Sequence, residues 1–84
     1  MKLVVIEWVD SASLRGVWND VETVRDHNDP VRCMSVGWML AQTKKATIIA
    51  AHLSDSRENG TVGRVGGDLT IPTSVITKIT VLRK

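Results

Sequence analysis

Residues 31–53, VRCMSVGWMLAQTKKATIIAAHL, constrain the fold more than any other stretch of the chain. They form two apolar runs rich in Val, Ile, Thr and Trp, joined by the polar tetrad QTKK at residues 42–45. Two such runs separated by a short polar segment are typical of antiparallel strands and their turn. We therefore predict a long β-hairpin at the centre of the fold, with a sharp bend or a close backbone approach at Gly37.

The segments before the hairpin predict one strand and one short helix. Residues 2–10 alternate with apolar side chains on both faces, so this strand is expected either to be buried on both faces or to be half covered by a neighbouring subunit. Asn19 or Asp20 is a suitable N-cap for a helix over residues 20–27. Because such a helix is too short to stand alone, Trp18, Val21 and Val24 are expected to pack it onto one end of the sheet.

The segments after the hairpin predict a loop and two closing strands. Residues 54–68 hold four of the six glycines, which predicts a long loop with a weak hairpin around residues 61–65. Residues 69–72 form a short strand that ends at a proline, and residues 75–82 form the last strand. In that last strand Val75, Ile79 and Val81 are expected to face inward.

Together these segments predict a mainly β fold of five strands, with one short helix after strand one, in a single domain over residues 1–84. Short strands with tight connections in so short a chain predict a small, partly open barrel of the SH3-like or Sm-like kind. A chain of 84 residues buries a small core, so oligomerisation is expected.

Charge and composition restrict the function classes. The net charge of +2, from 11 basic and 9 acidic residues, is too weak for the footprint of a dedicated duplex-binding protein, although the C-terminal end is basic. No apolar run approaches the ~20 residues of a membrane span. We therefore expect no membrane association, and we expect the protein to be located in the cytoplasm. The single cysteine, Cys33, is expected to be a buried, inert thiol.

Neither catalysis nor metal binding is expected. Asp10, Ser11 and Ser13 lack a nucleophile elbow and have the pattern of a turn that caps backbone amides. The two histidines and Cys33 are too few and too scattered for a zinc site, which takes four ligands with paired spacing. The chain is therefore not expected to be an enzyme or to hold a metal or cofactor.

Two features are candidates for ligand binding. The glycine-rich segment 60–67 could wrap a phosphate, with Arg57 and Arg64 supplying charge, although a solvated loop is the simpler interpretation. Trp18, near Arg15, lies outside the predicted strands and could stack a base, although tryptophans in small domains are usually core or interface residues. The predicted ligand-binding residues are therefore Arg15, Trp18, Arg57 and Arg64.

Several segments resemble a group of small, mostly uncharacterised bacteriophage proteins with an Sm-like or SH3-like β-barrel. The similar segments are WVDSAS, GVW, SVGWML, ATIIAAHLS and the closing LTIPTSVITKITVL before a basic C-terminus. The resemblance implies a small cytoplasmic protein of an infected or lysogenic host cell. It also implies a homo-oligomer with no enzymatic activity.

Two functions follow as hypotheses. The first is a non-enzymatic, homo-oligomeric binding module for nucleic acid or a nucleotide, which uses arginines and a tryptophan at a subunit edge. The alternative is a protein-interaction module that binds and modulates a host protein through a strand edge or an apolar outer face.

Overall fold

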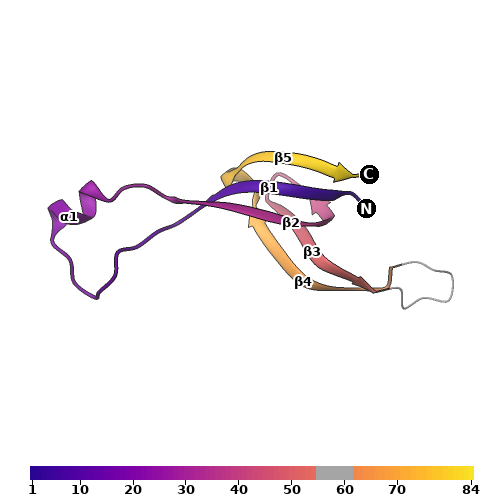
Figure 1. Ribbon diagram of the computed structural model, residues 1–84, viewed down its shortest axis with the longest axis horizontal. Coiled ribbons are helices and arrows are strands. Elements are labelled where there is room, and N and C mark those ends of the chain that lie inside the picture. Colours follow the sequence, from indigo (N-terminus) through magenta and orange to yellow (C-terminus); the bar gives the residue numbers. More distant parts are fainter. Residues whose placement is uncertain (55–61) are drawn as a thin grey trace.

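The computed structural model describes residues 1–54 and 62–84, which form one five-stranded antiparallel sheet (Figure 1). The elements in chain order are β1 (Leu3–Asp10), α1 (Val21–Asp26), β2 (Val31–Gln42), β3 (Ala46–Ser54), β4 (Arg64–Pro72), the 3-10 turn η1 (Thr73–Val75) and β5 (Ile76–Arg83). The strand order is β4-β3-β2-β1-β5, so the sheet is not closed and β4 and β5 are its edges. The prediction of a mainly β fold with five strands and one short helix after strand one is confirmed.

The central hairpin is formed by β2 and β3, as predicted. Its turn is closed by Thr43, whose backbone N–H donates to the carbonyl of Ala46 at 2.9 Å. The Thr43 hydroxyl also lies 3.1 Å from both the N–H and the carbonyl oxygen of Ala46. These local hydrogen bonds fix the register at the end of the hairpin, because the turn sets which residues face each other.

The core lies on the concave side of the curved sheet. Its buried side chains are Val4 and Ile6 of β1, Ile49 of β3 and Ile71 of β4. Two strands separate β1 from β4 in the sheet, so their side chains meet because the sheet curls around them. Partly buried residues pack around this cluster: Trp8, Met39, Val75, Ile76 and Ile79.

Gly37 lies where β2 passes close to β3. A Cβ atom at this position would lie 2.9 Å from the carbonyl oxygen of Ala50 and 3.1 Å from the Cβ atom of Ile49. The predicted close backbone approach at this glycine is therefore confirmed.

Substitution of Gly37 by alanine is expected to lower the free energy of unfolding by about 1–3 kcal/mol, the usual cost of overpacking a core. The measurement is urea unfolding of Gly37→Ala beside Gly66→Ala, since a Cβ at Gly66 would meet nothing closer than 3.6 Å. Equal destabilisation by the two substitutions would contradict the steric explanation.

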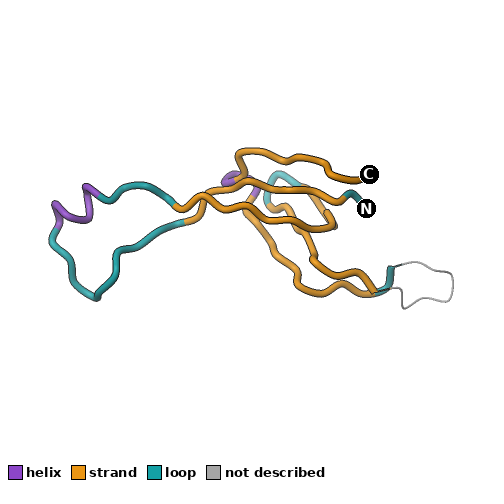
Figure 2. Tube along the Cα trace, in the orientation of Figure 1, coloured by secondary structure: helices purple, strands orange, loops and turns teal. Residues whose placement is uncertain are grey.

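The connection between β1 and β2 was wrongly predicted to cover the sheet. Residues 11–30, here called the arm, project away from the sheet and carry α1 at their far end (Figure 2). Every residue of the arm is exposed except Leu14, which is half-buried. The pairing of β1 with β2 continues to Asp10 and Val31, so both limbs of the arm leave the sheet in the same direction.

The segment before β5 also differs from the prediction. β4 begins at Arg64, well before the predicted short strand, and Val65 pairs with Leu53 of β3 rather than within a loop hairpin. Glycines hide the strand because they have no side chains to alternate, and Gly67 has a φ of 63° at an irregular point of the ladder.

In β5 a register shift opposite Glu7 and Trp8 brings Ile76 against the core. The predicted inward residues Val75 and Ile79 do pack on the core. Val81 pairs with the buried Val4 on the same face, although it is 42% exposed.

Candidate functional site

The arm presents apolar side chains to solvent. Val17 is 90% exposed and Trp18 is 92% exposed, and Val21 and Val24 of α1 are exposed by 62% and 48%. No residue of α1 is buried. Large apolar side chains gathered on a projecting segment typically mark a surface that another molecule covers. The arm is therefore the first candidate site.

The conformation of the arm is set by local hydrogen bonds. The side chain of Asp20 caps α1 by accepting hydrogen bonds from the N–H of Glu22 at 3.2 Å and from the hydroxyl of Thr23. At the other end His27 Nδ1 lies 2.9 Å from the carbonyl oxygen of Thr23, to which it donates when protonated there. Both ends of this short helix are thus capped by arm residues, and of the two predicted N-cap candidates, Asn19 and Asp20, the structure shows Asp20 in that role.

A narrow hollow of about 290 Å³ lies between the two limbs of the arm. Leu14 of one limb and Val24 of the other both line it, and Leu14 is the arm's only half-buried residue. The hollow holds too little apolar surface to keep the arm folded without further contacts.

The cap makes α1 sensitive to acid. The hydrogen bond from the Thr23 hydroxyl to the Asp20 carboxylate lowers the pKa of Asp20 below its ordinary value. The carboxylate therefore stabilises α1 at pH values above the unfolded-state pKa of about 3.9, and this stabilisation is lost as the pH falls through the lower folded-state pKa. We expect the Cα chemical shifts of residues 20–26 to move toward coil values in that range.

Asp20→Asn tests this assignment, because asparagine is a good N-cap that does not titrate. The acid transition of α1 should disappear in this variant and remain in Asp26→Asn. A transition of unchanged size in Asp20→Asn would contradict the role of the cap.

The structure separates the predicted ligand-binding residues. Arg15 and Trp18 lie on the arm, and Arg64 is the first residue of β4. The start of β4 lies at the opposite end of the molecule from α1, along the longest dimension of 60 Å (Figure 1). Arg57 lies outside the described residues. Within one chain Arg15 and Trp18 are therefore both exposed on the arm, and Arg64 does not join them.

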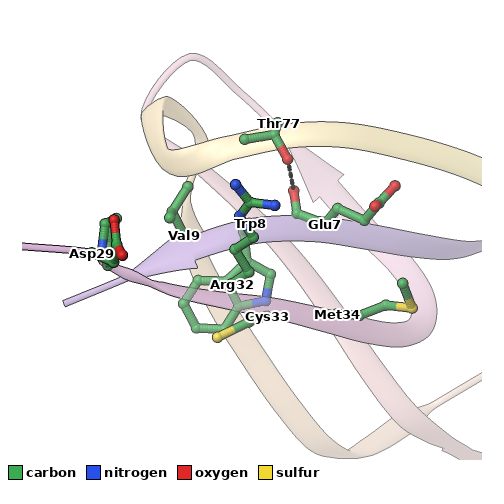
Figure 3. Close-up of a pocket in the computed structure, with 9 residues that line it drawn as sticks. Glu7, Trp8, Val9, Asp29, Arg32, Cys33, Met34 and Thr77 are labelled. Atoms are coloured by element: carbon green, nitrogen blue, oxygen red, sulfur yellow. Dashed lines mark hydrogen bonds between the residues drawn. The ribbon is translucent and has the colours of Figure 1, made fainter. Parts of the chain in front are cut away.

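A groove of about 740 Å³ lies at the base of the arm (Figure 3). Its lining comes from β1, β2, β5 and the end of the arm: Glu7, Trp8, Val9, Asp29, Pro30, Arg32, Cys33, Met34 and Thr77. Sequence reasoning did not find this groove, because its residues come from three strands and from the register shift in β5. No motif or spacing in the sequence marks them.

The groove has few groups free for chemistry. The indole N–H of Trp8 donates to the hydroxyl of Ser35 at 3.0 Å, and the hydroxyl of Thr77 donates to the carbonyl of Glu7 at 3.1 Å. Cys33, predicted to be buried, is only partly buried here. Its thiol donates to the carbonyl of Val31 at 3.9 Å, and no histidine is among the described residues that line the groove.

The outer face of β1, β2 and β5 forms a second apolar surface. Residues that pair across antiparallel strands share a face, and Leu3, Val5 and Glu7 alternate with the buried Val4 and Ile6. Three cross-strand rows follow on this outer face: Arg83, Leu3 and Trp38; Thr80, Val5 and Val36; and Lys78, Glu7 and Met34. Met34 and Val36 are 69% and 55% exposed. Within one chain β1 is therefore buried only on its inner face, its outer residues Leu3, Val5 and Glu7 are half-buried, and the covering by a neighbouring subunit stays a prediction.

The residues considered for catalysis and for metal binding form no site in the described part of the chain. The carboxylate of Asp10 accepts a hydrogen bond from the N–H of Ser11 at 2.8 Å, which is the turn chemistry expected there. His52 is exposed on β3. Within residues 1–54 and 62–84, no group of three or more His, Cys, Asp or Glu side chains is placed to hold a metal ion.

In the described part of the chain, no helix has the length and apolar character needed to cross a membrane. Comparisons with protein-family models, with curated proteins and with solved structures find no match to this chain.

Proposed function

We propose that this protein is a non-enzymatic protein-interaction module that binds its partner through the arm. The observation that carries the proposal is the 92% exposure of Trp18 beside the 90% exposure of Val17. Tryptophan is enriched among the residues that dominate binding energy at protein interfaces. A large apolar side chain that is exposed on a projecting segment favours a partner, because burying its apolar surface at an interface is favourable.

The sheet is the scaffold that holds the arm. We assign it to the small, partly open barrels of the SH3-like or Sm-like kind. The support is the position of β1 between β2 and β5, together with a core that β1, β3, β4 and β5 share. We further propose that this chain is a bacteriophage protein and that it binds a protein partner in the cytoplasm of the host cell.

The test is affinity capture with tagged wild-type protein, Trp18→Ala and the control Val65→Ala. Val65 is also an exposed apolar residue, at 40%, but it lies on β4 away from the arm. Wild type and control should retain a stoichiometric partner, either untagged copies of this chain or a host protein. Trp18→Ala should bind it at least ~30-fold more weakly, as a hot-spot residue does. Equal capture by Trp18→Ala, or no stoichiometric partner for wild type, would contradict the proposal.

A second candidate is a binding module for nucleic acid or a nucleotide. It is favoured by the exposed indole of Trp18 on the same arm as Arg15, since stacking of a base contributes ~1–3 kcal/mol. Arg64 lies at the other end of the molecule from the arm (Figure 1). Arg15 and Arg64 can therefore contact the same ligand only in an oligomer or on an extended strand of nucleic acid.

Tryptophan fluorescence and mobility shifts with RNA, DNA and cyclic nucleotides at low salt test the second candidate. A steep salt dependence would indicate several phosphate contacts, and a shallow one would indicate a small ligand. The absence of any response would exclude this candidate and leave the protein-interaction proposal in place.

A further inference from the structure

The chain exposes far more surface than a folded monomer of its size. Its solvent-accessible surface is 6806 Å², whereas a 9.2 kDa monomer is expected to expose about 4,900 Å². The radius of gyration is 17.2 Å, compared with about 12 Å for a compact domain of this length. The excess surface of about 1,900 Å² exceeds the ~800 Å² that each partner buries in an interface of standard size.

The charges of the arm and of the sheet have opposite signs. The arm carries Arg15 and Arg25 against four acidic residues, Asp20, Glu22, Asp26 and Asp29. Because the whole chain has a formal charge of +2, the arm contributes −2 and the rest of the chain +4. The arm is therefore complementary in charge to the body of the same protein.

The outer face of β1, β2 and β5 has the matching chemistry. It contains the exposed apolar residues Met34 and Val36, and two of its three rows begin with a basic residue, Arg83 or Lys78. Arg32 lies opposite Val9 on the same face and is exposed. An apolar surface bordered by basic side chains fits an arm that combines Trp18 and valines with acidic side chains.

We propose that the arm of one copy packs on the outer face of the sheet of a second copy, and that the two copies exchange arms reciprocally. This inference rests on the proposed function of the arm and names its partner as another molecule of the same chain. The arm does not cover this face within its own chain, because both limbs leave the sheet beyond the end of β1 and β2 (Figure 2). The exchange covers both exposed apolar surfaces in one contact.

A charge-swap experiment tests the exchange. Variant A carries Asp26→Lys and Asp29→Lys, which change the arm from −2 to +2 and leave the Asp20 cap intact. Variant B carries Arg32→Glu and Arg83→Glu, which make the outer face acidic. Lys78 stays in place because it faces Glu7 across the strands. All four positions are exposed, and circular dichroism confirms that each variant is folded.

Sedimentation velocity then gives the masses of wild type, of each variant and of their mixture. Wild type should be a dimer, A alone and B alone should be monomers, and the mixture should form an A–B dimer, since both swapped contacts are then attractive. Association of wild type should weaken as salt screens the charges.

A monomeric wild type would contradict the exchange of arms. The proposed function would then still be tested independently by the capture experiment with Trp18→Ala. Dimers of A alone and B alone as strong as those of wild type would overturn the charge-matched contact.

Discussion

Ile6→Ala is expected to lower the free energy of unfolding by about 2–5 kcal/mol, the usual cost of truncating a buried isoleucine. Ile6 is fully buried at the centre of a core that contains few other large side chains: Val4, Ile49 and Ile71. The total stability of an 84-residue domain is about 4–13 kcal/mol, so the variant should be partly unfolded at 37 °C. The measurement is urea unfolding followed by circular dichroism at one fixed protein concentration, because association adds to the apparent stability.

Val65→Ala is the matched control for this prediction. Val65 is also an aliphatic β-strand residue but is 40% exposed, so its truncation should change the free energy of unfolding by less than about 0.5 kcal/mol. A loss in Ile6→Ala no larger than that in Val65→Ala would show that the core does not lie on the face assigned to it.

Replacement of the arm, residues 11–30, by Asn-Gly is expected to leave a folded sheet that no longer associates. Asp10 and Val31 are paired residues, and a two-residue Asn-Gly turn is well suited to join paired antiparallel strands. No arm residue belongs to the core, so the sheet should keep its circular dichroism spectrum. Self-association should weaken at least ~100-fold, because the hot-spot tryptophan and its neighbours are lost together.

Sedimentation of the shortened chain beside wild type measures this effect over a range of concentrations. A shortened chain that associates as strongly as wild type would show that the arm is not the docking element. A shortened chain that unfolds would show that the arm supports the sheet in a way its exposed side chains do not explain.

The central hairpin and the first strand could be predicted because their patterns depend on local properties. Two apolar runs around a polar tetrad leave few alternatives to a hairpin, and a glycine between large side chains indicates a close approach. The buried set of β1, with Val4 and Ile6, follows from strand alternation alone.

The position of the arm could not be predicted, because no local pattern specifies the direction in which a long connection leaves a sheet. Val21 and Val24 have the spacing of a helix that packs on a core, and the same spacing serves a helix that packs on another molecule. Sequence reasoning assigned them to the chain's own sheet, whereas the structure leaves them exposed. The apolar outer face of strand one is the sequence signal that pointed to a partner.

The register shift opposite Glu7 and Trp8 explains the error in β5. Strict alternation would place Ile76 and Ile79 on opposite faces, yet both pack on the core. Bulges insert an extra residue into one strand and reverse the alternation beyond it, and no residue type in this segment marks the insertion.

The same shift contributes Thr77 to the groove at the base of the arm. That groove therefore could not be predicted from the sequence either.

Photo-crosslinking from position 18 tests most directly whether the arm of one copy packs on the sheet of another. Trp18 is replaced by p-benzoylphenylalanine in ¹⁵N-labelled protein, which is mixed with unlabelled wild type, irradiated, digested and analysed by mass spectrometry. If the arms are exchanged, we expect cross-linked dimers in which a labelled arm is joined to an unlabelled peptide from residues 34–38 or 78–83. Cross-links confined to a single chain, or the absence of dimers at concentrations where wild type sediments as a dimer, would contradict the exchange.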